Sequence, residues 1–346
     1  MAIPGLDQRS RDVLVAIIAE YVRTAEPVGS RAIARRHIRS LSPATIRNVM
    51  ADLEEMGYLA QPHTSAGRVP TDKAYRFYVD HLERVPWVGQ TPDPRESSPR
   101  TDAAEQLMAE TPARLSERTH MTGMLLAPPL QDTALDRIDL VPLGDERALI
   151  VVVTDTGWVT ARAIPLGPRA SIEELREVGR TLTRRYRGKT YREILDDVAA
   201  PVDPLDPLWT RTRPLLEQVV ALLRDRTLYV SGAPNMLDHP DVSDAATTRS
   251  LLRAFEEKAR LIDLLSRLAA EPGVQVMIGS ENPMQEMREC SLIASTYTYR
   301  GQALGVLGVV GPRRMAYSDV ISLVDEAARL VSESLSRARH QLYLPS

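Results

Sequence analysis

The sequence predicts a multidomain α+β protein that begins with a winged helix-turn-helix. Three observations support this fold class. A helix start at Ser42 and Pro43 follows two shorter helical patterns, a stiff basic loop occupies residues 61–71, and mixed strand and helix patterns follow a proline-rich stretch. At 346 residues, the chain is long enough for two or three domains.

Two helices are predicted before Ser42. Apolar residues recur at helical spacing in the first: Val13, Leu14, Ile17, Ile18, Tyr21 and Val22. Residues 27–30 then form a turn and a cap that open a short second helix to about His37, and five residues lead from there to Ser42. Helices at this spacing are typical of a helix-turn-helix, in which the later helix enters the major groove.

The third helix has a clear start and end. Ser42 is a good N-cap, Pro43 suits the first helical position, and Gly57 ends the helix in the left-handed conformation. One face is apolar and is expected to be buried: Ile46, Val49, Met50, Leu53 and Met56.

The opposite face of this helix carries the candidate base readers. It presents Ala44, Arg47, Asn48 and Ala51, with Thr45 at its flank. Small residues allow close approach to a surface, and Arg47 and Asn48 have donor patterns that match guanine and adenine edges. The alternative is a solvated helix face, but the caps, the small neighbours and the following loop together favour DNA contact for Ser42, Ala44, Thr45, Arg47 and Asn48.

The loop after this helix is a candidate wing. Residues 58–60 form a short strand, 61–68 a hairpin tip, Val69 starts the return strand, and Thr71 caps another helix. The tip holds donors suited to phosphate oxygens: His63, Thr64, Ser65 and Arg68. Such contacts hold register without reading sequence.

Basic charge is concentrated in this region. Residues 31–76 hold eight Lys or Arg and four Asp or Glu, whereas the whole chain has a net charge of −3. A polyanion is therefore expected to bind here. Arg39 is a candidate phosphate contact, although for it, Arg35 and Arg36 a purely solubilising role stays open.

These segments carry a family resemblance. Residues 26–30, 44–48, 57–59, 61–71 and 75–80, and later 305–317, closely resemble HrcA, the family of bacterial heat-inducible transcription repressors. The most specific part is the wing sequence Pro-His-Thr-Ser-Ala-Gly-Arg at 62–68. Val49 and Ala74 depart from the family pattern, which tends to have Asp and Gly there, and neither change is expected to abolish binding.

The resemblance implies an architecture and partners. It implies a GAF-like α+β domain interrupted by an inserted α+β dimerisation domain. It also implies a homodimer on an inverted-repeat operator in double-stranded DNA ahead of chaperone genes, and the chaperonin GroEL as the partner that keeps the repressor active. The alternative function is a GAF-type small-molecule-responsive transcription regulator, which a polar-lined, enclosed pocket between the C-terminal strands and helices would favour.

The expected domains follow from this order. They are a winged-helix DNA-binding domain at 1–84, a linker at 85–100, a GAF-like domain at 101–129 and 227–342, and the inserted dimerisation domain at 130–226. Beyond the linker the sequence predicts helices over 103–118, 171–187, 191–199, 208–224 and 247–270 and from Ser318, with strands over 135–143, 148–154, 158–166, 274–278, 291–299 and 303–310 and near Leu228.

Other classes of protein are disfavoured. There is no run of eighteen apolar residues, no signal pattern, and a single cysteine, Cys290, so we expect a soluble cytoplasmic protein without a membrane partner. The six histidines lack metal-ligand spacing, and no nucleophile and base form a recognisable motif. We therefore expect neither an enzyme nor a bound cofactor.

Overall fold

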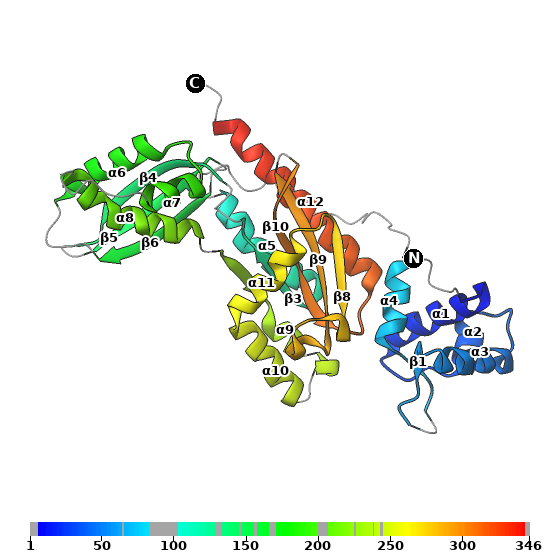
Figure 1. Cartoon of the computed structure of the whole chain (residues 1–346). Coiled ribbons are helices and arrows are strands. Elements are labelled where there is room, and N and C mark those ends of the chain that lie inside the picture. The colour runs from blue at the N-terminus through cyan, green and yellow to red at the C-terminus, as the bar shows by residue number, and fades with distance from the viewer. Residues whose placement is uncertain are drawn as a thin grey trace.

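The computed structural model describes residues 6–63, 66–82, 103–128, 133–144, 147–155, 158–165, 171–199, 207–224, 226–237, 239–242, 245–299 and 301–342. Three bodies lie in a row: a winged helix at one end, a five-stranded core in the middle, and a three-stranded body at the other end (Figure 1). The proposed linker at 85–100 lies outside the described residues.

The N-terminal body has the expected winged-helix order. It comprises α1 (Gln8–Thr24), α2 (Ser30–Arg36), α3 (Pro43–Glu55), β1 (Leu59–Ala60), β2 (Val69–Pro70) and α4 (Asp72–Asp80). The buried side chains Ile17, Ile46 and Leu53, all 0% exposed, join α1 to α3. Thr71 caps α4 by accepting from the Ala74 N–H at 3.4 Å. The winged-helix prediction is confirmed.

A buried carboxylate ties α1 to α2. The Glu20 side chain is 5% exposed and pairs with Arg23 at 2.7 Å, with Arg36, and with His37 at 3.0 Å. The hydrogen bond with His37, followed by those with the two arginines, lowers the pKa of Glu20 to about 2. The carboxylate therefore stays ionised at neutral pH and fixes the helix that precedes the turn to α3.

The core contains an antiparallel sheet, which among the described residues has five strands in the order β7-β3-β10-β9-β8. The strands are β3 (Thr122–Leu126), β7 (Leu228–Ser231), β8 (Val274–Ile278), β9 (Cys290–Tyr299) and β10 (Gln302–Pro312). Helices α5 (Ala103–Thr119) and α12 (Tyr317–Leu342) cover one face, and α9 (Ala233–Leu237), α10 (Ala245–Glu256) and α11 (Lys258–Leu268) pack on the other side. Short 3₁₀ turns at Pro240–Val242, Gly279–Glu281 and Gln285–Met287 complete this body.

Alternation along the strands divides the core into two apolar layers. Leu125 and Leu307 pack with the α12 side, whereas their neighbours Leu126 and Val306 pack with the α11 side. The register pairs Leu307 with Leu125 and Val306 with Leu126, so that each pair shares a face. Both faces are therefore buried, which explains the nearly continuous apolar runs of β3 and β10.

The third body is a separate sheet with its own helices. Strands β4 (Leu135–Pro142), β5 (Arg147–Thr154) and β6 (Val159–Pro165) form an antiparallel sheet in that order. Helices α6 (Ile172–Tyr186), α7 (Tyr191–Ala199) and α8 (Pro207–Arg224) follow in the chain. Ser171 and Glu174 form a reciprocal capping box at the start of α6.

The winged helix docks on the core through the start of α4. Asp72 accepts a hydrogen bond from the Ser280 N–H at 2.9 Å and pairs with Arg313 at 3.3 Å. Gly279 makes this approach possible, because its φ is +51° and an added Cβ would lie 2.3 Å from an Asp72 carboxylate oxygen.

Further contacts extend this docking junction, which we define as Asp72, Tyr75 and Arg76 of α4 against residues 276–281 and Arg313–Tyr317 of the core. Arg76 pairs with Glu281 and donates to the Val276 carbonyl at 2.6 Å. The rings of Tyr75 and Tyr317, both buried, lie 5.5 Å apart. The two bodies therefore meet through ion pairs around a buried aromatic contact.

Two local predictions are wrong, and one strand lacks a prediction. Met56 is 42% exposed, because α3 ends at Glu55 and Met56 lies at its C-cap beyond the last buried turn. The single helix expected over 247–270 is broken at Glu257, whose ψ of 57° is not helical, into α10 and α11. Strand β3 was not predicted, because a short buried apolar run carries no periodicity.

No helix among the described residues is long and apolar enough to cross a membrane.

The docking junction predicts a fixed orientation of the winged helix. Nitroxide labels at exposed Ser40→Cys and Glu271→Cys should give one narrow distance distribution by pulsed electron resonance, with the labelled chain diluted in unlabelled protein. Asp72→Asn combined with Arg76→Gln should broaden the distribution, since both ion pairs across the junction are lost.

The matched control is Arg267→Gln, which removes an ion pair with Asp263 on the surface of α11. It should leave the distribution unchanged. A distribution that stays narrow in the double variant would show that the ion pairs do not set the orientation.

Candidate nucleic-acid interface

The start of α3 is held rigidly by its own side chains. The Ser42 hydroxyl accepts from the Thr45 N–H at 3.1 Å and lies 2.9 Å from the Thr45 hydroxyl. Ser42 is exposed and Thr45 is half-buried. These two hydroxyls therefore first serve the cap, and they hold the helix N-terminus in a fixed and accessible position.

The outward face of α3 is the expected one. Ala44, Arg47, Asn48 and Ala51 are all exposed, while Ile46 on the opposite face is fully buried. Arg47 and Asn48 are therefore consecutive exposed residues of a helix whose opposite face is anchored in the core of the winged helix. Both side chains are therefore free of the core, and their hydrogen-bond donors face outward.

The wing is fixed at its base. An added Cβ on Gly67 would lie 2.5 Å from the Val28 carbonyl oxygen, so only glycine allows this close approach. Next to it, the backbones of Arg68 and Val28 exchange hydrogen bonds of 2.8 and 2.9 Å. His63 is exposed toward the tip, whereas Thr64 and Ser65 lie outside the described residues.

Arg68 has a partner that the sequence did not reveal. Its guanidinium donates through Nε and Nη2 to Glu54 Oε2 of α3, at 2.8 and 2.7 Å, and its side chain is 22% exposed. This bond joins the return strand of the wing to the last turn of α3. No spacing pattern links residues 54 and 68, so sequence reasoning placed Arg68 among the phosphate contacts and missed Glu54.

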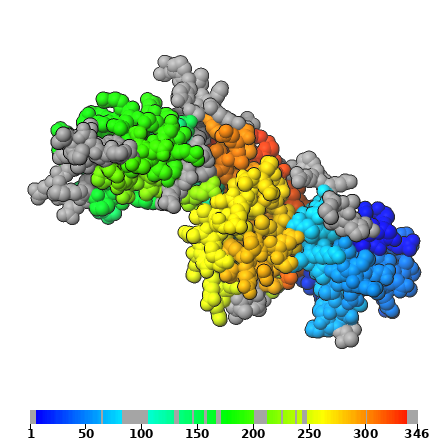
Figure 2. All heavy atoms as spheres, viewed as in Figure 1, coloured from blue at the N-terminus to red at the C-terminus, as the bar shows by residue number. Residues whose placement is uncertain are grey.

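Other basic side chains surround this surface. Arg31, Arg35 and Arg39 are exposed on α2 and on the turn that follows it. Figure 2 shows the winged helix as a lobe at one end of the molecule, with most of its surface clear of the core. The exposed face of α3 and the wing are therefore accessible to a large partner.

An exposed, capped helix after a short turn, with a wing locked beside it, defines the class of winged-helix DNA-binding proteins. Within the described residues, no group of three or more His, Cys, Asp or Glu side chains is placed to hold a metal ion.

The comparisons with known proteins identify the family. A family model described as the winged helix-turn-helix transcription repressor, HrcA DNA-binding, matches residues 5–82, and one described as the HrcA protein C-terminal domain matches residues 105–321. The chain belongs to the HrcA family.

Individual relatives agree along nearly the whole chain. The heat-inducible transcription repressor HrcA of Geobacter sulfurreducens is 43% identical, over 95% of this chain and 98% of the relative. That of Thermodesulfovibrio yellowstonii is 36% identical, over 96% and 98%. A solved structure described as a hypothetical protein has a TM-score of 0.67 at 23% identity and covers 96% of this chain and all of that one, which supports the fold alone.

The Glu54–Arg68 bond predicts that removal of a negative charge at residue 54 weakens DNA binding. Removing a negative charge near DNA should strengthen binding by simple electrostatics. We expect Glu54→Gln instead to weaken operator binding by about 1 kcal/mol, because it loosens the charge-assisted bond that holds the wing. Titration of labelled operator DNA would measure this.

Glu55→Gln is the matched control, since Glu55 is the neighbouring exposed carboxylate and α3 ends there. It should bind operator DNA as tightly as the unchanged protein, or more tightly. If Glu54→Gln also tightened binding, the pair would have no role in positioning the wing.

Proposed function

We propose that this chain represses transcription by binding an inverted-repeat operator in double-stranded DNA as a homodimer. The observation that carries the proposal is the outward face of α3, fixed beside a locked wing. Arg47 and Asn48 read base edges, while Ser42, Ala44 and Thr45 allow close approach of the helix start. His63, Thr64, Ser65, Arg68 and Arg39 form the surrounding contacts with the DNA backbone, and Arg68 also positions the wing.

The domain assignment belongs to the same proposal. We treat 1–84 as the DNA-binding domain, 85–100 as a linker, 101–129 with 227–342 as a GAF-like domain, and 130–226 as an inserted dimerisation domain. The support is that the strands of the five-stranded sheet come from 122–126 and from 228–312, whereas those of the three-stranded sheet come from 135–165.

A second copy of the chain fits an apolar patch on the inserted body. Val141 and Leu143, at 45% and 51% exposed, lie at the end of β4, which is an edge strand of its sheet. Helix α6 covers the middle of this edge, where Thr183 bonds to the Ile138 backbone, but the exposed apolar side chains of Val141 and Leu143 lie beyond that contact and favour association with another chain. The Ile172 side chain at the start of α6 is 53% exposed.

The direction of α6 brings this third side chain to the same place. Arg187, just after α6, bonds to Asp136, and Thr183 bonds to Ile138, so α6 runs antiparallel to β4. Ile172, at the opposite end of α6, therefore lies toward the end of β4 that carries Leu143. We define Val141, Leu143 and Ile172 as the insert patch.

The partners implied by the family complete the proposal. The operator lies ahead of chaperone genes, the chaperonin GroEL keeps the repressor active, and the protein acts in the cytoplasm, where its DNA is. Repression of transcription is a binding function, and the HrcA family is not a class of enzymes. Titration of inverted-repeat and half-site duplexes, with and without chaperonin, tests the proposal directly.

The alternative is a GAF-type small-molecule-responsive regulator, and the cavity that bears on it is open and has an apolar floor, unlike the enclosed, polar-lined pocket expected for that function. This cavity, of about 400 Å³, opens beside the docking junction. A ligand there is compatible with a repressor, since it would modify DNA binding and not replace it.

The base-reading role predicts a loss of specificity. Arg47→Ala and Asn48→Ala should each weaken specific operator binding by about 1 to 3 kcal/mol while binding to random DNA changes less. Arg35→Ala is the control for a general loss of positive charge, because it should weaken both kinds of DNA alike. Full discrimination by a folded Arg47 or Asn48 variant would remove that residue from base reading.

The insert patch predicts the assembly state. Leu143→Glu with Ile172→Glu should give a monomer in sedimentation and lower operator affinity by about 10² to 10⁴, since binding of the second half-site is no longer intramolecular. Leu252→Glu on α10, where Leu252 is 43% exposed, is the matched control and should stay dimeric. A double variant that still dimerises would place the two-fold contact elsewhere.

A further inference from the structure

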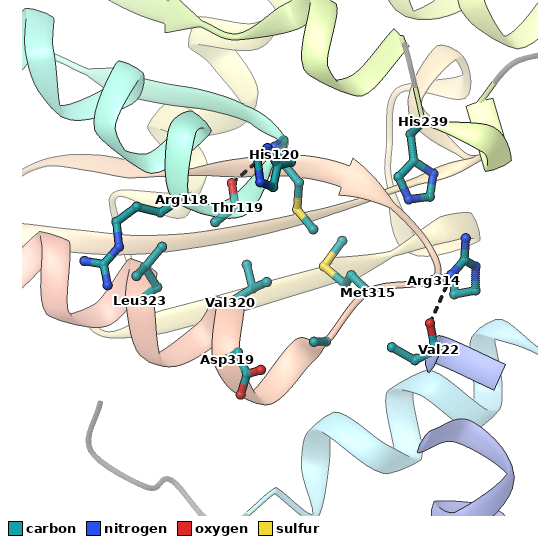
Figure 3. A pocket seen from close by; sticks show the side chains of 12 residues that line it. Val22, Arg118, Thr119, His120, His239, Arg314, Met315, Asp319, Val320 and Leu323 are labelled. Carbon is teal, nitrogen blue, oxygen red and sulfur yellow. Dashed lines mark hydrogen bonds between the residues drawn. The ribbon is translucent and has the colours of Figure 1, made fainter. Parts of the chain in front are cut away.

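A cavity of about 400 Å³ opens where the winged helix meets the core. It lies between the end of α1 at Val22, the end of α5 at Arg118, and the start of α12, and His239 lies above it (Figure 3). Neither the DNA-contacting face of α3 nor the insert patch contributes to it. The cavity is therefore separate from both surfaces.

The two sides of the cavity differ in chemistry. Its floor is apolar and consists of Val22, Met121, Met315, Val320 and Leu323. Its rim carries the nitrogen-bearing side chains Arg118, His120, His239 and Arg314. One carboxylate, Asp319, also lines the cavity, and Figure 3 shows its side chain at the far edge from His120 and His239.

His239 offers a hydrogen-bond donor to the cavity. Its Nδ1 accepts from the Asp241 N–H at 3.2 Å. Burial lowers the pKa of His239, so the ring is neutral at pH 7. A neutral imidazole that accepts at Nδ1 carries its proton on Nε2.

Arg314 joins the cavity to both bodies. It holds Asp241 through two hydrogen bonds of 2.7 and 3.0 Å and donates to the Val22 carbonyl of α1 at 3.0 Å. Its side chain is only 13% exposed, and these contacts use three of the five N–H groups of a guanidinium. Asp241 balances the charge of Arg314, and residues of both bodies fix the guanidinium at the rim with two N–H groups left over.

His120 is held at the rim by its backbone. Its φ of 54° is in the left-handed region, and its N–H donates to the Ser116 carbonyl at 2.8 Å. This conformation turns the chain from α5 into β3. Glycine would adopt it at lower cost, but would leave the rim without an imidazole.

We propose that this cavity binds a small organic anion, with an apolar body on the methionine and valine floor and a carboxylate, sulfonate or phosphate head against His239 and Arg314, which lie at the same end of the cavity (Figure 3). An apolar pocket of this size with a few convergent polar groups is typical of small-molecule sites. An anion accepts hydrogen bonds without donating any, which suits a rim of N–H donors.

Such a ligand would act on the docking junction. Arg314 contacts Val22 when the winged helix is docked on the core. A ligand that binds the docked state more tightly than the released state therefore shifts the equilibrium toward docking. Ligand binding at this cavity is distinct from operator binding, and it can be measured without DNA.

The test uses 8-anilinonaphthalene-1-sulfonate as the probe on the full chain, followed by fluorescence. The neutral N-phenyl-1-naphthylamine, which has the same rings without the sulfonate, is the comparison ligand. His239→Phe should weaken binding of the anionic probe by about tenfold, the effect of one charge-assisted hydrogen bond, and leave the neutral probe nearly unchanged. Val320→Trp should abolish binding of both by filling the floor.

Arg267→Gln, on exposed α11, is the matched control and should bind both probes normally. Thermal unfolding of each variant checks that it is folded, and Leu323→Phe replaces Val320→Trp if the latter is not. Two results would overturn the proposal: binding that survives in a folded floor-filling variant, or equal losses of the anionic and neutral probes in the His239→Phe variant.

Discussion

The orientation of the DNA-binding domain depends on the carboxylate of Asp72. This side chain stands in the first turn of α4, immediately after the Thr71 cap, and it accepts from the Ser280 N–H and pairs with Arg313 in the core. Gly279 is needed to let it approach. In the proposed dimer, two recognition helices on a symmetric operator must match the spacing of its half-sites. Contacts that fix α4 on the core therefore determine where α3 can lie on DNA, although none of them belongs to the DNA-contacting face.

The ion pairs of the docking junction are individually weak. Its ion pairs are partly exposed, and exposed pairs stabilise a structure by about 1 kcal/mol or less each. Its buried part carries a cost, because the Tyr75 hydroxyl is buried with no hydrogen-bond partner among the described residues. The buried side chains Ile17 and Leu53 join α1 to α3 within the winged helix and are not part of the junction. The junction thus combines partly exposed ion pairs with a buried aromatic contact, and it is separate from the packing that joins α1 to α3.

The sequence predicted those features that have local causes. Ser42, Gly57 and Thr71 fix helix ends through their own backbone and side-chain preferences, and the elements around them were found. The break at Glu257 has no glycine or proline to mark it, and the buried run of β3 has no periodicity. The Glu54–Arg68 bond and the junction join residues that are 14 to more than 200 positions apart. One sequence holds no signal for such pairs, so the exposed face of α3 could be predicted while the contacts that position it could not.

Several basic residues of the winged helix are less available to DNA than the sequence alone suggests. Of the basic side chains between residues 31 and 76, Arg36, Arg68 and Arg76 are bound to Glu20, Glu54 and Glu281. Lys73 donates to the Met56 carbonyl at 2.8 Å and lies over the Tyr58 ring. Three of the eight basic residues are thus paired with carboxylates, and the field available to steer DNA is smaller than the sequence suggests. Discrimination must then depend less on attraction to phosphates and more on geometry: a helix whose start is capped, a wing locked to it by Arg68, and a body that holds both in one orientation.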